Sequence, residues 1–289
     1  MMQRRGDAET QRKEGGWRFI KALLRTSAPL RLCVLLFIAV TGPLRAKAPT
    51  TLPPRVPLEP GEGLALGPFK DGDKKHGEAD REFPMGSLAK LVWLRLEGTE
   101  WAARDVRFVC KGSWEGVPCW KREGHGKVDL GKALQESCNL AFLAWARMSV
   151  QRWAEESGEG SVSVRLEEAF RPFLGNRMPG GDGVPKLDQA WVGDGALLRT
   201  TPTAMLAWME EPAQEGLHSL CLRYLGNILQ DPIGSWWIKT GTAPVIGDPG
   251  ATSAWVVGGN GMGFAVLHLP RGRGKAEGVA RFKAVMGLR

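Results

Sequence analysis

The sequence predicts an α+β fold, because segments with helical periodicity come first and segments typical of strands come last. Between residues 87 and 229, apolar residues recur at helical spacing. Residues 235–242, 252–258 and 263–269 are rich in Trp, Ile, Val and Phe and are separated by Gly and Pro turns, which is typical of consecutive antiparallel strands. A closing amphipathic helix is expected over about residues 276–286. Helices followed by a strand meander and a helix favour the α+β class.

Composition and charge limit the classes of protein that fit. The 289 residues are 43 % hydrophobic and 24 % charged, as in ordinary soluble domains, which argues against collagen-like, low-complexity and multi-span membrane proteins. The formal net charge is +8, but residues 1–48 hold ten of the 39 Lys and Arg and three of the 31 Asp and Glu. The remaining chain is therefore almost neutral and has no strong field for phosphates, so no nucleic-acid partner is expected.

Residues 1–48 contain the three parts of a secretory signal. A basic stretch precedes the apolar run from Leu32 to Val40, and the small-x-small site Ala46-Lys47-Ala48 follows. We expect a signal peptide that is cleaved after Ala48. The alternative is an uncleaved membrane anchor, although the apolar run is much shorter than the ~20 residues that cross a bilayer. In both cases the body is expected in the periplasm or another extracytoplasmic compartment.

The segment 49–60 contains five prolines and is predicted to be an extended linker, so we expect the folded domain over residues 61–289. Of the five cysteines, four lie in this domain. Cys110 and Cys119 bracket a loop with two glycines and a proline, which predicts a disulfide; two buried thiols are the alternative. The four histidines lie far apart and no Cys-x-x-Cys pair occurs, so no metal site and no cofactor are expected.

Several helices begin at recognisable start signals. A buried helix is predicted near Ser87, after a proline and a glycine, and Pro202 is suited to the first turn of another helix. Asp129 is suited to be the N-cap of a short helix. The other predicted helical segments are 130–136, 140–156 and 217–229.

Ser87 and Lys90 stand three residues apart, so on a helix they share one face. A serine needs a base to become a nucleophile, and lysine can act as that base when burial or a neighbouring cation lowers its pKa. Taken alone, the pair has a simpler interpretation as the solvated start of a helix.

Two further motifs follow in a fixed order. Ser137-Cys138-Asn139 lies at a predicted helix junction, and Lys239-Thr240-Gly241-Thr242-Ala243 lies on a predicted strand. Together with Ser87-Leu88-Ala89-Lys90 they resemble the signature of the penicillin-binding transpeptidase and serine β-lactamase superfamily, which is Ser-x-x-Lys, Ser-x-Asn and Lys-Thr-Gly. His125-Gly126-Lys127 and Gly193-Asp194-Gly195 are similar to the transpeptidase branch, and the likeness covers roughly residues 80–286.

The resemblance implies an antiparallel sheet flanked by helices, with an all-helical lobe. It also implies that Ser87 attacks a carbonyl and forms an acyl-enzyme while Lys90 takes its proton. Ser137 would relay a proton to the departing amine, and Asn139 would bind the substrate and hold Lys90.

The third motif would bind the substrate. The resemblance implies that Lys239, Thr240 and Thr242 receive its carboxylate and that Lys239 also helps to keep Lys90 neutral. Gly241 would let the substrate backbone approach closely. The backbone N–H groups of Ser87 and Thr242 would form the oxyanion hole.

The implied function is that of a D-alanyl-D-alanine transpeptidase or carboxypeptidase, which acts on peptidoglycan stem peptides and is trapped by β-lactams. A serine β-lactamase is the alternative, because the chain has no room for the extra amino-terminal module of large transpeptidases. No clear water-activating motif occurs, since Glu167 and Glu168 do not match the class A spacing and are expected on a helix face. A non-catalytic penicillin-binding sensor is a second alternative.

Overall fold

The computed structural model of the chain describes residues 56–67, 74–174, 186–211, 215–225, 229–231, 234–260 and 263–288. All of these residues belong to one compact unit, Ala48–Arg289. The predicted signal peptide or anchor and residues 49–55 of the predicted linker lie outside the described residues, so both remain predictions. Within the described ranges, no helix is sufficiently long and apolar to cross a membrane.

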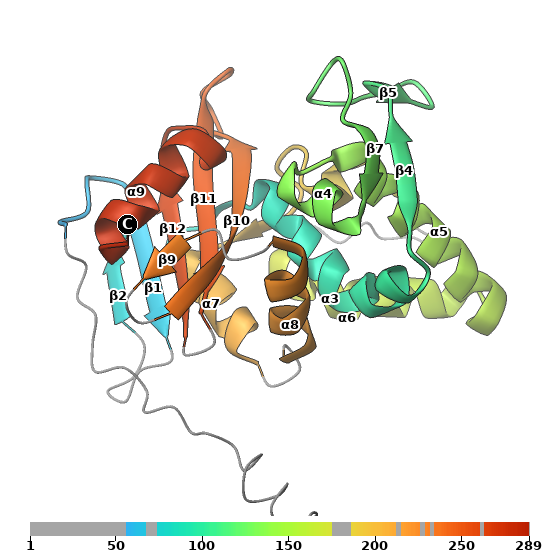
Figure 1. Ribbon diagram of the computed structural model, residues 1–289, viewed down its shortest axis with the longest axis horizontal. Helices are drawn as coiled ribbons and strands as arrows, with labels where there is room; N and C mark the ends of the chain where they lie inside the picture. Colours follow the sequence, from blue (N-terminus) through green and yellow to red (C-terminus); the bar gives the residue numbers. More distant parts are fainter. Residues whose placement is uncertain are drawn as a thin grey trace, which may run out of the picture. The chain divides into compact units, whose positions relative to one another are not determined.

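A six-stranded antiparallel sheet forms one layer of the unit, with the strand order β2-β1-β12-β11-β10-β9 (Figure 1). Its last three long strands confirm the predicted strand meander. Two short strands from the start of the domain extend the sheet beyond β12, and β9 pairs with β10 at the other edge. The bounds are β1 Gly63–Gly67, β2 Lys74–Gly77, β9 Leu229–Asp231, β10 Gly234–Pro244, β11 Thr252–Gly259 and β12 Phe264–Leu269.

Both faces of the sheet are buried. Successive strand residues point to opposite faces, so Trp236 and Ile238 of β10 join one apolar cluster with Phe282. Trp237, which lies between them in the sequence, joins the larger cluster formed with the helices. Phe282 belongs to α9 (Val279–Met286), which covers the first face and confirms the predicted closing helix; one π-helical turn, η5 (Gly274–Gly278), precedes it (Figure 1).

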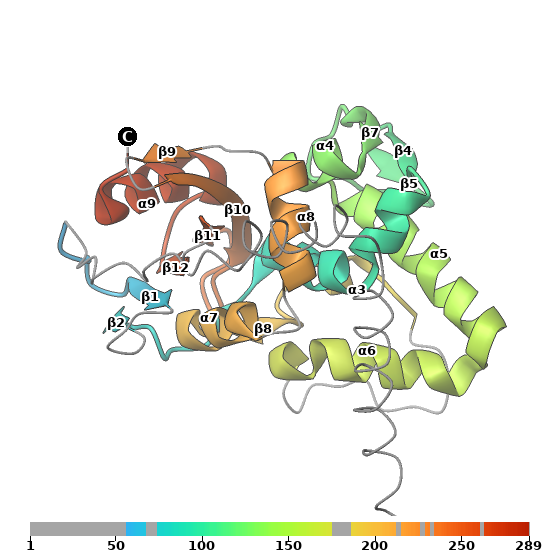
Figure 2. The ribbon, with the colours of Figure 1, turned by 60° about the horizontal axis from the view of Figure 1, so that its bottom comes forward.

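The other helices cover the second face and extend away from the sheet as a helical lobe (Figure 2). Helix α7 packs against β1 and β12, α8 packs against α3 and β10, and α5 and α6 pack against each other. The predicted α+β fold is therefore confirmed, whereas the lobe is not all-helical, because the strands Arg107–Cys110 and Gly126–Asp129 pair within it against the helices (Figure 1). The helices are α3 Ala89–Ala103, α4 Leu130–Gln135, α5 Asn139–Ser157, α6 Glu159–Leu174, α7 Pro202–Glu210 and α8 Glu215–Leu225.

Short elements connect these helices. The two-stranded pairs are β3–β8, β4–β7 and β5–β6, and the 3₁₀ turns η1 and η3 precede α3 and Gly193. Their bounds are β3 Phe83–Pro84, η1 Gly86–Leu88, β4 Arg107–Cys110, β5 Ser113–Trp114, β6 Val117–Pro118, β7 Gly126–Asp129, η3 Gln189–Val192 and β8 Arg199–Thr200.

Two of the predicted helix starts are capped by side chains. The Asp129 side chain accepts a 2.8 Å hydrogen bond from the backbone N–H of Lys132, at the start of α4. Pro202 is the first residue of α7, and the hydroxyl of the preceding Thr201 accepts from Ala204 N at 2.9 Å. Local sequence therefore determines where these two helices begin.

Candidate active site

Ser87 lies in η1, the turn that leads into α3. The preceding Gly86 has φ +55°, a left-handed conformation that glycine adopts without strain. A Cβ at Gly86 would lie 2.4 Å from the carbonyl oxygen of Thr242, so only glycine lets this turn approach β10 so closely. Ser87 is partly exposed. The hydroxyl is thereby held at the surface of the site by a buried turn.

Lys90 follows on the first turn of α3, and its Nζ lies 3.1 Å from Ser87 Oγ. The helical spacing expected from the sequence is confirmed. The Lys90 side chain has no exposed surface. Its Nζ also donates to Asn139 Oδ1 at 2.6 Å and to the backbone carbonyl oxygen of Val192 at 2.8 Å. One buried amine therefore joins the nucleophile, the second motif and η3.

Burial lowers the pKa of Lys90 to about 7, because removing the ammonium group from water disfavours its charged form. The negative charges of Cys138 and Asp194 would oppose this shift, but burial dominates. At neutral pH a substantial fraction of Lys90 is thus uncharged and able to take a proton. The lowered pKa follows mainly from burial, so it does not need the charge of Lys239 that the resemblance invoked.

The second motif lies where α4 ends and α5 begins. Ser137 has φ +52°, which is unusual for a residue with a side chain and costs on the order of 1–3 kcal/mol. Cys138 is the N-cap of α5, and Asn139 is its first residue. This geometry sends the side chain of Ser137 to Lys239 and that of Asn139 to Lys90. One tripeptide therefore contacts both lysines of the site.

The third motif lies on β10, as predicted. The Lys239 side chain is buried, and its Nζ donates to Ser137 Oγ at 2.5 Å and to the carbonyl oxygen of Thr240 at 2.6 Å. Burial, followed by the nearby charge of Lys90, lowers the pKa of Lys239 well below its usual value. The two amines thus share one electrostatic environment, and the three motifs converge.

The remaining residues of the third motif line the contact between β10 and η1. A Cβ at Gly241 would lie 3.1 Å from the carbonyl oxygen of Met85, so the glycine permits the close contact. Thr240 is partly exposed and Thr242 is exposed. Thr242 Oγ1 accepts a 3.1 Å hydrogen bond from Gly274 N, which leaves its own O–H as a donor. Donors for a carboxylate are therefore present at the solvent-exposed part of β10.

The sequence did not identify Val192 as part of the site, because the group that contacts Lys90 is a backbone carbonyl. Trp93 Nε1 of α3 holds the adjacent carbonyl of Trp191 with a 2.8 Å hydrogen bond. Gly193 has φ +98°, and a Cβ there would lie 2.0 Å from Gly86 O. The Gly193-Asp194-Gly195 stretch was the available signal, since a glycine pair often marks a close backbone approach.

The glutamates considered as water activators lie elsewhere. Glu167 and Glu168 belong to α6. Glu167 accepts a 2.9 Å hydrogen bond from Arg171, one helical turn later. This is the helix-face arrangement expected from the sequence.

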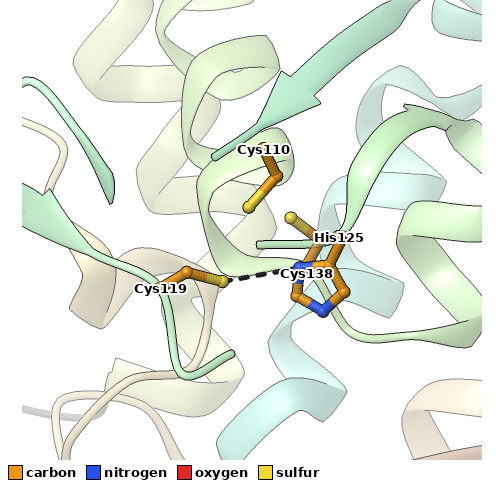
Figure 3. A group of neighbouring side chains, drawn as sticks. All are labelled: Cys110, Cys119, His125 and Cys138. Carbon is orange, nitrogen blue, oxygen red and sulfur yellow. Dashed lines mark hydrogen bonds between the residues drawn. The ribbon is translucent and has the colours of Figure 1, made fainter. Parts of the chain in front are cut away.

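The predicted disulfide between Cys110 and Cys119 is wrong: both are free thiols, as are Cys138 and Cys221. Instead, Cys110 and Cys119 lie beside His125 and Cys138, and all four ligand atoms are within 4.8 Å of one another (Figure 3). The expectation that no metal site exists rested on the separation of these residues in the sequence. The fold removes that separation.

Comparisons with known proteins identify the fold. No family model matches the chain, and no curated protein matches it. Among solved structures, the class D β-lactamase YbXI from Nostoc has a TM-score of 0.51 and 13 % identity, and the match covers 77 % of this chain and 90 % of that one. The chain has the serine β-lactamase and penicillin-binding protein fold.

Further solved structures are also similar to the chain. The C-terminal domain of the Bacillus licheniformis BlaR penicillin-receptor has a TM-score of 0.49 and 16 % identity, covering 78 % of this chain and 87 % of that chain. Pseudomonas aeruginosa PBP2 has a TM-score of 0.44 and 15 % identity, and the match covers 71 % of this chain and 60 % of that chain. The chain thus spans less than two thirds of that penicillin-binding protein. It also covers 50 % of a Helicobacter pylori PBP2 chain.

Proposed function

We propose that this chain is an exported serine acyl-transferase that acts on the D-alanyl-D-alanine end of peptidoglycan stem peptides and that β-lactams acylate. The observation that carries the proposal is the buried amine of Lys90, 3.1 Å from Ser87 Oγ and with a pKa lowered to about 7. A partly neutral lysine beside a serine hydroxyl is the base that a serine nucleophile needs.

The first half-reaction forms an ester. Lys90 Nζ takes the proton of Ser87 Oγ as that oxygen attacks the carbonyl carbon of the penultimate D-alanine. The backbone N–H groups of Ser87 and Thr242 stabilise the oxyanion, and the close contact of Gly86 with Thr242 supports this pairing. The carbon–nitrogen bond then breaks, and the terminal D-alanine leaves.

Ser137 and Lys239 would supply the proton that the leaving amine needs. Lys239 Nζ donates a 2.5 Å hydrogen bond to Ser137 Oγ. This bond stabilises the serine oxygen as it loses its own proton, so Ser137 can pass that proton to the departing amine. Thr240 and Thr242 bind the terminal carboxylate of the donor peptide through their hydroxyls. An amine or water then attacks the ester, which gives transpeptidation or carboxypeptidation.

A β-lactamase of the same fold is the second candidate. The Nostoc class D enzyme favours it, because the match covers 90 % of that chain. A β-lactamase must activate water beside the ester. The contacts described around Ser87 and Lys90 include no carboxylate, so the activator would have to be a carbamylated Lys90, as class D enzymes use. A penicillin sensor, which is acylated by β-lactams but does not turn over a peptide, is the third.

Fluorescent penicillin tests the proposal on the purified chain. We expect one covalent label per chain, mapped to Ser87 by mass spectrometry, and no label on Ser87→Ala. Ser157→Ala, at the exposed end of α5, is the matched control and keeps the label. A Ser87→Ala protein that is labelled as strongly as the wild type refutes the acyl-enzyme.

The lifetime of the label separates the candidates. Transpeptidase and carboxypeptidase chemistry predicts a long-lived penicilloyl ester and release of D-alanine from a synthetic stem pentapeptide. Rapid turnover of the antibiotic favours the β-lactamase. A long-lived label without release of D-alanine favours the sensor.

Export remains part of the proposal, because the stem peptides of the cell wall lie outside the cytoplasm and residues 1–48 have the pattern of a secretory signal. If the segment is not cleaved, it would associate the enzyme with the membrane. The intact mass of the protein recovered from the extracytoplasmic fraction distinguishes the two forms: cleavage after Ala48 shortens the chain, and an anchor leaves it whole.

A further inference from the structure

Four metal-ligand side chains converge next to the second motif. They are the thiols of Cys110, Cys119 and Cys138 and the imidazole of His125. Figure 3 shows them directed towards a shared centre from separate segments. All four residues are buried, and Cys119 Sγ lies 3.5 Å from His125 Nδ1. These residues have no role in the proposed acyl transfer, so their convergence needs another explanation.

The chemistry of the four ligand atoms is that of a structural zinc site. Three thiolates and one imidazole form the Cys₃His set of structural zinc sites, in which zinc lies about 2.3 Å from sulfur and about 2.0 Å from nitrogen. Ligand atoms on such a tetrahedron are separated by somewhat under 4 Å, and the four atoms here are already within 4.8 Å. A disulfide would account for only two of the three thiols. Small shifts of side chains would complete a closed four-ligand site.

The surroundings of His125 support ligation through Nδ1. Nε2 is buried and has no hydrogen-bond partner among the described residues. Glu136 Oε2 lies 4.0 Å from it. A metal-bound histidine commonly donates its other ring N–H to a carboxylate, which fixes the ring and increases its basicity. Glu136 is the residue placed to take that role.

The local charge also suits an anionic cluster. Binding Zn²⁺ with three cysteines releases three protons and leaves the site with a net charge of −1. The Nζ of Lys132 lies close by and donates to the carbonyl oxygen of His125 at 3.0 Å. Lys121 also acts electrostatically on His125. Two cations are therefore available to compensate the charge.

The backbone around the ligands is folded tightly. A Cβ at Gly112 would lie 1.8 Å from the carbonyl oxygen of Arg122, and one at Gly124 would lie 2.2 Å from that of Cys110. Both glycines have positive φ. Between β4 and β7, however, the only described strands are the two-residue pair β5 and β6 (Figure 1). A segment with so little regular structure gains order from a cross-link.

We propose that Cys110, Cys119, His125 and Cys138 bind one structural Zn²⁺ that joins the β4–β7 segment to the second motif. Cys138 is the residue between Ser137 and Asn139, so a metal bond to its Sγ fixes the middle residue of the tripeptide that contacts both lysines. Trp120 adds a second link, since its Nε1 donates to the carbonyl oxygen of Ser137 at 3.1 Å. Ser137 and Asn139 would then be positioned by the metal site.

Metal content of the full chain tests the binding directly. Protein purified without chelators under reducing conditions should contain one zinc per chain, and its Co²⁺ form should show the visible absorption of tetrahedral cobalt thiolate. Cys138→Ser and Cys119→Ser should lose at least about 10-fold in zinc affinity. Cys221→Ser is the matched control, a fully buried free thiol in α8 outside the cluster, and should keep the metal.

Two results would overturn the site. One is wild-type protein that neither contains zinc nor binds added Zn²⁺ or Co²⁺; the other is a disulfide among the three cluster cysteines in the reduced, metal-supplemented protein. Cobalt absorption of the wild type needs no variant, so misfolding of Cys138→Ser does not remove the test. The proposed site would also be contradicted if Cys221→Ser lost as much zinc affinity as Cys138→Ser and Cys119→Ser.

The effect on the active site rests on the proposed function, whereas metal binding does not. Chelation of zinc from the wild type should slow acylation by penicillin at least about 10-fold, and added zinc should restore the rate. If zinc binds but penicillin does not acylate the wild-type protein, the proposed function fails and the metal site stands. If zinc removal leaves acylation unchanged, the positioning role is refuted.

Discussion

The indole Nε1 of Trp255 donates a 2.7 Å hydrogen bond to the backbone carbonyl oxygen of Pro84, which precedes it by 171 residues. Trp255 lies on β11, in the middle of the sheet, and Pro84 ends the short strand β3, three residues before Ser87. Both residues are buried. The position of the nucleophile is thus set partly by a strand from the other end of the domain.

Trp255→Phe should destabilise the protein by more than the loss of ring volume explains. The Pro84 carbonyl would lose its donor in a buried environment, which costs about 1–3 kcal/mol. Trp236→Phe is the matched comparison, because Trp236 is buried on the opposite face of the sheet and its Nε1 has no partner among the described residues. Urea unfolding of both variants measures the difference, and equal destabilisation would contradict the role of the hydrogen bond.

Gly86→Ala should destabilise the fold by about 2–4 kcal/mol and slow acylation at least about tenfold. The reasons are the positive φ of Gly86 and the 2.4 Å approach of a Cβ to Thr242 O, which would push η1 away from β10. Gly160→Ala is the control, because Gly160 lies in α6 with nothing within 4 Å and should gain about 0.5–1 kcal/mol. Thermal unfolding and penicillin labelling give both values. Unchanged labelling of Gly86→Ala would refute the contact.

Acylation by penicillin should increase with pH and level off above about 7. The neutral amine of Lys90 is the reactive form, so the rate should fall about tenfold for each pH unit below its pKa of about 7. Lys90→Arg should stay slow across the whole range, since a guanidinium group does not lose its proton in proteins. Stopped-flow or quenched labelling from pH 5.5 to 8.5 tests this, and a flat wild-type profile would exclude Lys90 as the base.

Glu97→Ala should cost about 2–3 kcal/mol of unfolding free energy, because the buried carboxylate accepts from Ser149 Oγ, Arg152 Nη2 and Trp153 Nε1 and each lost bond is worth about 1 kcal/mol. These bonds join α3 to α5. Glu156→Ala removes the exposed partner of the same arginine and should change stability by less than about 0.5 kcal/mol. The free energies of unfolding of the two variants, measured by chemical denaturation, should therefore differ clearly. Similar decreases in both would show that the buried hydrogen bonds of Glu97 add no stability.

The parts of the site that sequence could predict are those with a local signature. Ser87 and Lys90 meet because three residues span almost one helical turn, and Asp129 and Thr201 cap helices through side chains that favour that position. The strands β10 to β12 are rich in Trp, Ile, Val and Phe and are separated by glycine and proline turns. Such features need no knowledge of distant residues.

The missed parts depend on pairing over long distances. Strand β1 forms only because Gly63–Gly67 pairs with β12, about two hundred residues later, and its short glycine-rich sequence carries no signal of that partner. The Cys110, Cys119, His125 and Cys138 cluster depends on the β4–β7 pairing and has no Cys-x-x-Cys spacing. For helix α6 the sequence predicted only that Glu167 and Glu168 lie on a helix face, and it did not give the bounds of the helix, because the glycines near its start are typical of a loop.

The three hydrogen bonds of Lys90 have a consequence for the direction of proton flow. The oxygens of Asn139 and Val192 have no hydrogen to give, so they must always receive one from the amine. Once the amine is deprotonated, only two hydrogens remain, and both are committed to these oxygens. Its lone pair is then left facing Ser87, which is the one hydrogen-bond partner of Lys90 among the described residues whose hydroxyl can supply a hydrogen. The carbonyl and the amide therefore aim the lone pair of the base at the nucleophile.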